Sequence, residues 1–267
     1  MIAKYKVTLE YDGTGYRGWQ TQKNARSVQE TLHLAAAKVF GAEVDVQGAG
    51  RTDAGVHALG QVAHMAVPRK MKAEKILFGL NDILPANINI LRVEEAGQDF
   101  HARHDAQKRV YIYVVSRERT AFAKRYVWWV RDHLHIGKMT QTSQIFAGFH
   151  DFTSFADRRM DKNASTMVLL DTVRLEEIGP WIVLTVSGSH FLWKMVRRMA
   201  GILVEVGRGN LTERDVEAML RGYSDLPAHY TAPPSGLFLA RVLYEGDVDE
   251  PVRLPLWCEY RYHEQSS

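Results

Sequence analysis

Cysteine and long hydrophobic runs are what this sequence most clearly lacks. Cys258 is the one cysteine among 267 residues, so no disulfide can form within the chain, and we expect a reducing, cytoplasmic compartment. No stretch approaches the roughly 18 consecutive apolar residues of a membrane-spanning helix, so we predict no membrane partner. The first residues show no apolar core followed by a cleavage site, and a secretory signal peptide is not expected.

A large excess of charge of one sign is missing as well. The 34 Lys and Arg residues stand against 31 Asp and Glu residues, which leaves a formal net charge of +3 and an isoelectric point near 8.9. This balance permits a polyanionic partner without requiring one. With 46% hydrophobic and 24% charged residues, the chain has a globular composition and is long enough for one large or two ordinary domains.

Hydrophobic periodicity predicts a mixed α+β fold. Residues 4–11 alternate apolar and polar side chains, as expected for a strand with one buried face. Ser27 begins a capping box, and the helix that it opens is expected to end at Gly41. Further strands are predicted over 43–46, 61–67, 89–94, 109–115, 168–178, 182–187 and 238–244, and further helices over 73–84, 139–146, 191–206 and from the cap Thr212 to Leu220. This order indicates two α+β halves with a boundary near residues 103–108.

The segment 13–18, Gly-Thr-Gly-Tyr-Arg-Gly, matches the glycine pattern of dinucleotide sites. In those sites a helix begins at the third glycine, and its N-terminus meets the pyrophosphate. Here the next helix cap is Ser27, so we favour a glycine turn and predict no nucleotide cofactor. The aromatic and polar side chains after the turn could still form a contact surface.

Histidine pairs are the candidates for a metal site. The eleven histidines include His101 with His104 and His133 with His135, but no cysteine lies near either pair. Neither pair has the H-E-x-x-H arrangement of zinc proteases, and the sequence has no G-x-S-x-G motif of serine hydrolases. We therefore predict that the chain holds no metal ion.

The loop 48–55 is rich in glycine and carries a charged pair. Its three glycines allow the backbone to bend sharply and to approach another group closely. Arg51 and Asp53 stand two residues apart, and a neighbouring guanidinium favours the ionised carboxylate that a carboxylate nucleophile requires. The same pair could instead be structural and hold the turn, and the residues themselves leave both interpretations open.

The predicted helix 191–206 has an apolar stripe and a charged face. The stripe consists of Leu192, Met195, Val196, Met199, Ile202, Leu203 and Val206. The opposite face carries Lys194, Arg197, Arg198, Gly201 and Glu205, and we expect this face to be solvated. Gly201 lowers helix stability by about 1 kcal/mol relative to alanine, which is tolerable if another segment packs close to it.

Residues 103–131 combine positive charge with aromatic side chains. Eight Lys and Arg residues stand there against two acids, an excess of six, so the rest of the chain is net acidic by about three. The cations are Arg103, Lys108, Arg109, Arg117, Arg119, Lys124, Arg125 and Arg131, and the rings are Tyr111, Tyr113, Tyr126, Trp128 and Trp129. Basic groups for phosphates and aromatic faces for unstacked bases are typical of RNA binding.

The loop 50–58, Gly-Arg-Thr-Asp-Ala-Gly-Val-His-Ala, resembles the signature loop of the tRNA pseudouridine synthase A family. Further motifs follow in the order of that family along almost the whole chain. They are Tyr11-Asp12-Gly13 with Gly18-Trp19-Gln20-Thr21-Gln22, Leu80-Asn81 with Leu84-Pro85, Phe100-His101-Ala102-Arg103, Lys108-Arg109-Val110-Tyr111-Ile112-Tyr113, His150-Asp151-Phe152-Thr153-Ser154-Phe155, Phe191-Leu192 with Met195-Val196-Arg197 and Gly201, Gly207-Arg208-Gly209, and Ala232-Pro233-Pro234-Ser235-Gly236-Leu237. The sequence departs at Arg198, where an asparagine is common, and near Thr166, where a usual arginine is missing; both changes could affect how tRNA is held.

The resemblance implies that uridine is isomerised to pseudouridine at positions 38, 39 and/or 40 in the anticodon stem-loop of tRNA. It also implies a homodimer in which one tRNA contacts both subunits, and no metal or organic cofactor. By motif, the expected site residues are the catalytic aspartate Asp53, its loop partner Arg51, the base-stacking tyrosine Tyr111, the basic residue Arg197 that pairs with the aspartate, and the substrate-binding residues His57 and Leu192.

The resemblance also implies a fold of two ferredoxin-like or RNA-recognition-motif-like halves. Their antiparallel sheets are expected to join into one continuous sheet, with helices on one face and a basic active-site cleft on the other. Residues 1–105 would form the N-terminal domain with the Asp53 loop, and residues 106–267 the C-terminal domain with the Tyr111 strand and the Arg197 helix. Three alternatives remain: the same chemistry on another RNA, a non-catalytic RNA-binding module, and a nucleotide-dependent oxidoreductase.

Overall fold

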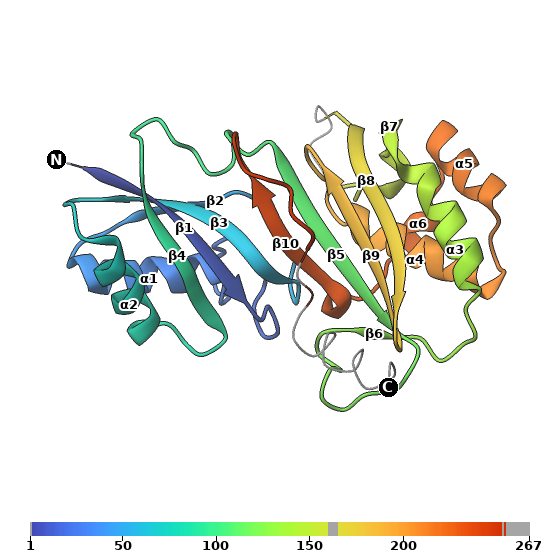
Figure 1. Ribbon diagram of the computed structural model, residues 1–267, viewed down its shortest axis with the longest axis horizontal. Helices are drawn as coiled ribbons and strands as arrows, with labels where there is room; N and C mark the ends of the chain where they lie inside the picture. Colours follow the sequence, from blue (N-terminus) through green and yellow to red (C-terminus); the bar gives the residue numbers. More distant parts are fainter. Residues whose placement is uncertain (1, 160–164, 253, 255–267) are drawn as a thin grey trace. The chain divides into compact units, whose positions relative to one another are not determined.

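The structure is a computed structural model that describes residues 2–159, 165–252 and 254, and Figure 1 shows its helices and strands. Cys258 lies outside the described residues. The chain divides into two compact units, which are described separately. Unit 1 comprises residues 1–107 and 239–251, and unit 2 contains residues 108–238.

The sheet of unit 1 is built around its first strand. The strands are β1 (Ala3–Tyr11), β2 (Asp45–Gly48), β3 (His57–Val67) and β4 (Ile88–Ala96). Their order is β4-β1-β3, β2 pairs with part of β3, and all these pairs are antiparallel. The predicted alternation of the first strand is confirmed, because Tyr5, Val7, Leu9 and Tyr11 are all buried.

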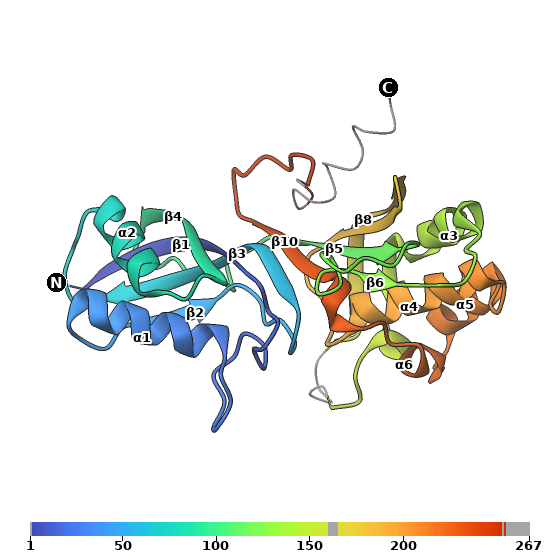
Figure 2. The same cartoon turned by 90° about the horizontal axis from the view of Figure 1, so that it is seen from below.

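Two helices accompany this sheet, α1 (Val28–Phe40) and α2 (Ala73–Ile83), and both were predicted. The Ser27 side chain accepts a hydrogen bond from the backbone of Glu30, and Gly41 ends α1 in the left-handed conformation with φ +70°. Figure 2 shows α1 running alongside the strands of unit 1. The helix buries Leu32 and Phe40 among its apolar side chains, which is how its apolar stripe contributes to the core.

The sheet of unit 2 has the order β5-β9-β8-β7, with antiparallel neighbours. Its strands are β5 (Lys108–Ser116), β7 (Gly148–Asp151), β8 (Met167–Ile178) and β9 (Trp181–Gly188). The two-residue strand β6 (Trp128–Trp129) lies parallel to β5, and β10 (Leu237–Leu243) leads the chain from unit 2 back into unit 1. The short strands β6 and β7 were not predicted, because neither Trp128–Trp129 nor Gly148–Asp151 alternates apolar and polar residues.

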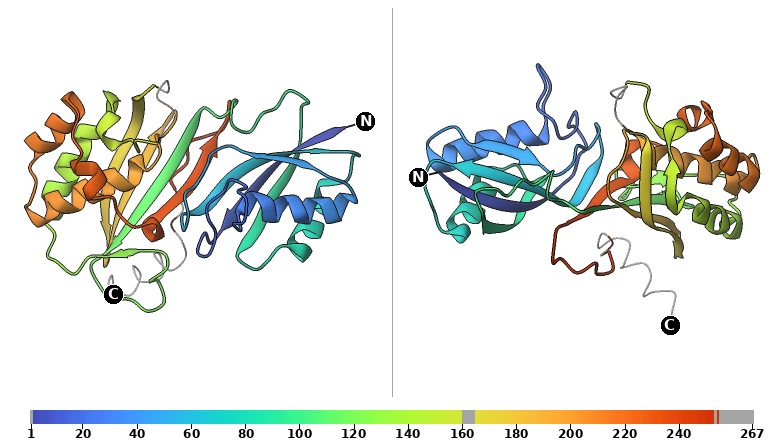
Figure 3. Two further views of the ribbon diagram at one scale, coloured as in Figure 1. Left: turned by 180° about the vertical axis from the view of Figure 1, so that it is seen from behind. Right: turned by 90° about the horizontal axis from the view of Figure 1, so that it is seen from above.

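The helices of unit 2 gather beside its strands, as Figure 3 shows for α3, α4 and α5. The elements are α3 (Ile136–Ser143), η1 (Gln144–Phe146), η2 (Thr153–Phe155), α4 (Met195–Arg208), α5 (Glu213–Arg221), α6 (Leu226–His229) and η3 (Pro234–Gly236). The predicted cap at Thr212 is confirmed, since Thr212 and Asp215 form a reciprocal capping box at the start of α5.

Helix α4 differs from its prediction in two respects. It begins at Met195 rather than at residue 191, because Lys194 adopts a left-handed φ of +65° and the N–H of Met195 closes a turn onto Leu192. The face expected to be solvated is largely buried, including Arg198 and Glu205. The close approach expected at Gly201 is confirmed, because a Cβ there would lie 1.6 Å from the Tyr230 carbonyl oxygen.

Each unit thus combines an antiparallel sheet with helices, which confirms the α+β class. The ferredoxin-like character of the halves, the joining of their sheets and the basic cleft stay predictions. Within the described ranges, no helix is long and apolar enough to cross a membrane. In the same residues, no group of three or more His, Cys, Asp and Glu side chains is placed to hold a metal ion.

Candidate active site

The loop between β2 and β3 carries Arg51 and Asp53. Arg51 is exposed, Thr52 is buried and Asp53 is partly exposed. A hydrogen bond of 3.1 Å from the N–H of Val56 to the carbonyl of Asp53 closes a tight turn. Gly55 takes the position in this turn that needs a positive φ, +76°. Asp53 therefore stands at the start of a closed turn rather than on a loose loop.

The glycine segment 13–18 packs directly against this loop. The N–H of Trp19 donates to the Thr52 carbonyl at 3.0 Å, and the N–H of Gly55 donates to the Tyr16 carbonyl at 3.3 Å. A Cβ on Gly13 would lie 1.9 Å from the Val56 carbonyl oxygen, and one on Gly18 would lie 2.4 Å from that of Thr52. These glycines allow two backbones to touch, and the next helix begins only at Val28, as the sequence predicted.

Side chains complete the support of the loop. The Tyr11 hydroxyl and Thr52 Oγ1 lie 2.7 Å apart and share a buried hydrogen bond. Gln61 Nε2 donates to the Gly50 carbonyl at 2.8 Å. The sequence did not identify Tyr11 or Gln61 as supports, because only folding brings them beside the loop.

His57 is fully buried and contacts the start of the glycine segment. Its Nδ1 lies 3.1 Å from Asp12 Oδ1 and 3.0 Å from the backbone nitrogen of Gly13. Burial by itself raises the pKa of Asp12, but the contact with His57 and the hydrogen bonds from Thr14 outweigh burial, and the pKa lies well below its usual range. His57 thus ties the end of the loop to Asp12, and its predicted contact with substrate stays a prediction.

The structural interpretation of Arg51 and Asp53, as a pair that holds the turn, stays a prediction. The backbone bonds and the glycine contacts given above close the turn.

Tyr111 lies on β5 in unit 2, opposite Val186 of β9. It is 8% exposed, and its ring makes a T-shaped contact with Phe191 at a centroid distance of 4.9 Å. Tyr113, two residues further on, donates its hydroxyl to the Pro233 carbonyl at 2.8 Å, and burial raises its pKa well above the usual value. Tyr113 is thus fixed as part of the core.

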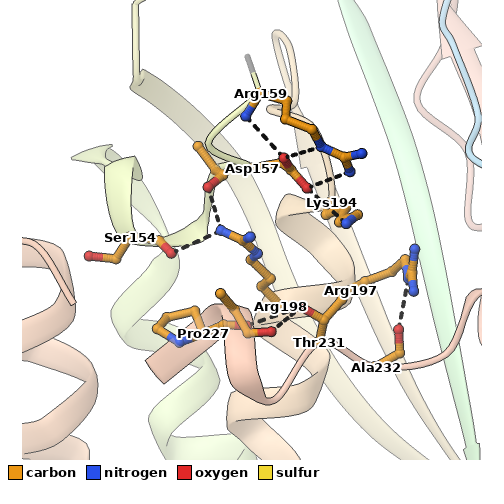
Figure 4. A network of polar contacts seen from close by, with 11 residues as sticks. Ser154, Asp157, Arg159, Lys194, Arg197, Arg198, Pro227, Thr231 and Ala232 are labelled. Carbon is orange, nitrogen blue, oxygen red and sulfur yellow. Dashed lines mark hydrogen bonds and ion pairs between the residues drawn. The ribbon is translucent and has the colours of Figure 1, made fainter. Parts of the chain in front are cut away.

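Arg197 stands in the first turn of α4 and is held by the segment after α6. Its Nε donates to the Ala232 carbonyl at 2.7 Å, and the N–H of Ala232 donates back to the Arg197 carbonyl at 3.1 Å (Figure 4). Leu192, also a predicted site residue, is buried just before the helix. The close contact of Gly201 with Tyr230 brings this segment against α4.

The predicted site residues are divided between the units. Arg51, Asp53 and His57 belong to unit 1, and Tyr111, Leu192 and Arg197 belong to unit 2. Within each unit they are held by specific contacts. Their meeting in one active site stays a prediction.

The basic segment 103–131 is used partly for structural contacts. Lys108 pairs with Asp171 at 3.4 Å, Arg117 pairs with Glu177 at 2.5 Å, and Arg109 donates to the Ser189 carbonyl at 2.9 Å. Tyr111 and Tyr113 are buried, whereas Trp129 is exposed with Arg119 over its ring at 6.0 Å. The predicted RNA-binding character of this segment stays a prediction.

Comparison with known proteins places the chain among enzymes that modify tRNA. The family described as "tRNA pseudouridine synthase" matches residues 8–105 and 143–245. "tRNA pseudouridine synthase A" from Ruminiclostridium cellulolyticum is 37% identical over 245 residues, which are 91% of this chain and 100% of the relative. The proteins of the same name from Syntrophotalea carbinolica and Rhodospirillum rubrum are 41% identical over 245 residues (90% and 95% of the two chains) and 37% identical over 257 residues (94% and 91%).

The family match covers parts of both units and includes every predicted site residue except Tyr111. Pseudouridine synthases are isomerases, because uridine and pseudouridine contain the same atoms. The chain belongs to the tRNA pseudouridine synthase family, and it is an isomerase that acts on tRNA.

Proposed function

We propose that the enzyme isomerises uridine at positions 38, 39 and/or 40 in the anticodon stem-loop of tRNA, with Asp53 as the catalytic carboxylate. The reaction breaks the N1–C1′ bond, turns the base and rejoins it to the sugar through C5. Since no atom is added or lost, the proposal requires no metal ion or organic cofactor.

The observation that carries this proposal is the way the Asp53 loop is built. The backbone of the turn is closed by Val56 and backed by Trp19 and the glycines, while the Asp53 side chain stays partly exposed. A carboxylate on such a fixed backbone needs little reorganisation when charge develops on the substrate. The carboxylate can stabilise or trap positive charge at C1′, attack the base at C6, or remove a sugar proton.

The target uridine must leave the helix stack before its glycosidic bond can be reached. Extrusion of a base costs a few kcal/mol, which a pocket recovers by stacking and hydrogen bonding. In this proposal Tyr111 supplies the stacking face, and Arg51 fills the vacated space or holds a phosphate. Arg197 pairs with Asp53, and His57 and Leu192 complete the substrate-binding set.

The proposal includes a cytoplasmic homodimer in which one tRNA contacts both subunits. The resemblance of the motifs to the family supports this part. Light scattering tests the dimer: without tRNA we expect a particle of twice the chain mass of 30.4 kDa, and with tRNA a particle of two chains plus the mass of one tRNA.

Mapping of the modified positions tests the choice of substrate. We expect unmodified tRNA with uridine at 38, 39 and 40 to gain pseudouridine at one or more of these positions when incubated with the enzyme. A tRNA in which these uridines are replaced by cytidine serves as the control and should gain none. Modification outside the anticodon stem-loop, in either tRNA, would favour another target and contradict the proposal.

A further inference from the structure

Unit 2 carries a second cluster of cations and aromatic rings, apart from the predicted site residues. It consists of Arg158, Arg159, Trp193, Lys194 and Tyr223, and we call it the 158/193 surface. All five side chains are exposed or partly exposed. The sequence did not indicate this surface, because its members come from three separate segments of the chain.

One buried carboxylate aligns two of the cations. Asp157 is 7% exposed, and its oxygens accept hydrogen bonds from Arg159 Nε at 3.0 Å and Nη2 at 3.1 Å, and from Lys194 Nζ at 2.8 Å (Figure 4). The bond from Arg159 is the main reason why the pKa of Asp157 lies well below its usual range. The carboxylate therefore stays ionised and keeps both cations in place.

The aromatic rings orient the guanidinium groups. The Arg159 guanidinium lies 4.2 Å from the centroid of the Trp193 ring, and Lys194 Nζ lies 5.6 Å from it. Arg158 donates to the Tyr223 hydroxyl from Nη2 at 2.7 Å and from Nε at 3.1 Å. These contacts fix the direction in which each cationic group faces.

Arg198 fastens the loop of Asp157 to α4. Its Nη1 donates to the carbonyls of Ser154 and Ala156, and the side chain is 6% exposed (Figure 4). Burial lowers the pKa of Arg198, yet an arginine remains charged in a folded protein. The arginine that stands where the family commonly has asparagine thus both supports the loop and adds a positive charge beneath it.

The cluster is not electrically balanced by its own acids. Among the described residues, the four cations Arg158, Arg159, Lys194 and Arg198 stand against Asp157 and Asp225, which leaves an excess of two positive charges. The first turn of α4 contains no acidic residue, so the positive end of the helix adds to the same field. An anionic ligand that presents several oxygen atoms along its length would neutralise this excess of positive charge.

We propose that the 158/193 surface binds the phosphodiester backbone of the tRNA substrate, with Arg158, Arg159 and Lys194 as the phosphate ligands. This inference rests on the proposed function, which supplies tRNA as the anion. Lys194 stands three residues before Arg197, so the surface lies next to the start of the helix that carries this predicted site residue.

The double variant Arg158→Gln/Arg159→Gln tests the inference. We expect its Kd for unmodified tRNA to rise about tenfold at 0.15 M salt, and its log–log salt slope to become shallower by about one to two. KM should rise in parallel, while the single-turnover rate at saturating tRNA stays within about twofold of the wild type. Arg158→Lys/Arg159→Lys keeps the charge and should retain most of the affinity.

Arg174→Gln is the matched control, because Arg174 is an exposed arginine of β8 in the same unit, paired with Glu176. It should bind tRNA as the wild type does. If Arg159→Gln disturbs Asp157 and lowers the Tm, Arg158→Gln alone gives the same test with about a threefold effect, because the Arg158 guanidinium donates to Tyr223 whereas that of Arg159 pairs with Asp157.

If the double variant had the same Kd, KM and salt slope as the wild type, the inference would be overturned. The same outcome is expected if the surface binds an acidic protein instead of tRNA. The proposed function fails separately, if the wild-type enzyme binds tRNA but forms no pseudouridine. In that case weaker binding by the double variant would still support the phosphate surface.

Discussion

Gly13 and Gly18 lie against the carbonyl groups of Val56 and Thr52, which flank Asp53 in the sequence. These contacts leave no space for a side chain at either position, so the position of the Asp53 carboxylate depends on both residues being glycine. The Tyr11–Thr52 hydrogen bond and the His57–Asp12 contact act on the same short loop. At the scale of the residue, these contacts fix the backbone of Asp53, while its side chain is partly exposed.

Replacing Gly13 by alanine should therefore be far more harmful than a glycine-to-alanine change usually is. Its Cβ would lie 1.9 Å from a carbonyl oxygen, and we expect Gly13→Ala to lower the free energy of unfolding by about 2–4 kcal/mol and to abolish most activity. Gly97→Ala is the control, because nothing lies within 4 Å of a Cβ there. Urea unfolding and pseudouridine formation measure both effects, and equal stability of the two variants would contradict this account of the glycine contact.

Asp12 should make the free energy of unfolding depend on pH. Because the pKa of its carboxyl is lowered on folding, Asp12 stabilises the folded state at pH values above the unfolded pKa of about 4, and this contribution is lost as the pH falls through the folded value. Asp12→Asn should therefore be less stable than the wild type at pH 7, and the difference should shrink toward pH 2. Urea unfolding across this range measures it, and a difference that stays constant with pH would refute the role.

The burial of charged side chains on helix α4 depends on contacts with neighbouring segments. Amphipathic periodicity predicted its apolar stripe, and it also predicted a solvated charged face, which is wrong for Arg198 and Glu205. Arg198 is buried because the carbonyls of Ser154 and Ala156 accept its N–H groups, and Glu205 because Arg208 and Asn210 bind its carboxylate. Such partners arrive through tertiary folding, so periodicity along one helix cannot reveal them.

Gly201→Ala should reverse the usual preference of a helix for alanine. An alanine inside a helix is commonly about 1 kcal/mol more favourable than glycine, but at this position its Cβ would lie 1.6 Å from the Tyr230 carbonyl oxygen. We expect a loss of about 2–4 kcal/mol in the free energy of unfolding and reduced activity, because the displaced segment includes Ala232, which holds Arg197.

Gly137→Ala in α3 is the comparison for Gly201→Ala, since nothing lies within 4 Å of a Cβ at Gly137. It should leave stability unchanged or raise it by up to about 1 kcal/mol. If both variants were stabilised equally, the contact between Gly201 and Tyr230 would not determine the packing of α4.

At the scale of the whole molecule, a net charge of +3 conceals an uneven distribution. The sequence located an excess of positive charge in residues 103–131, and the structure uses Lys108, Arg109 and Arg117 of that segment for internal contacts. The 158/193 surface lies outside it and was not predicted, because Asp157 organises cations from distant segments. The classes of the elements and the Asp53 loop could be predicted, since each depends on a local pattern or a motif.

The most direct test of the central claim is the release of tritium from tRNA that carries 5-tritiated uridine, under single-turnover conditions. The wild-type enzyme should release tritium, and Asp53→Asn should be slower by about 10³-fold or more while still binding tRNA. Asp82→Asn, which removes an exposed carboxylate on α2 in the same unit, should match the wild type. If Asp53→Asn released tritium at the wild-type rate, or if the wild type released no tritium, the assignment of Asp53 as the catalytic carboxylate would be contradicted.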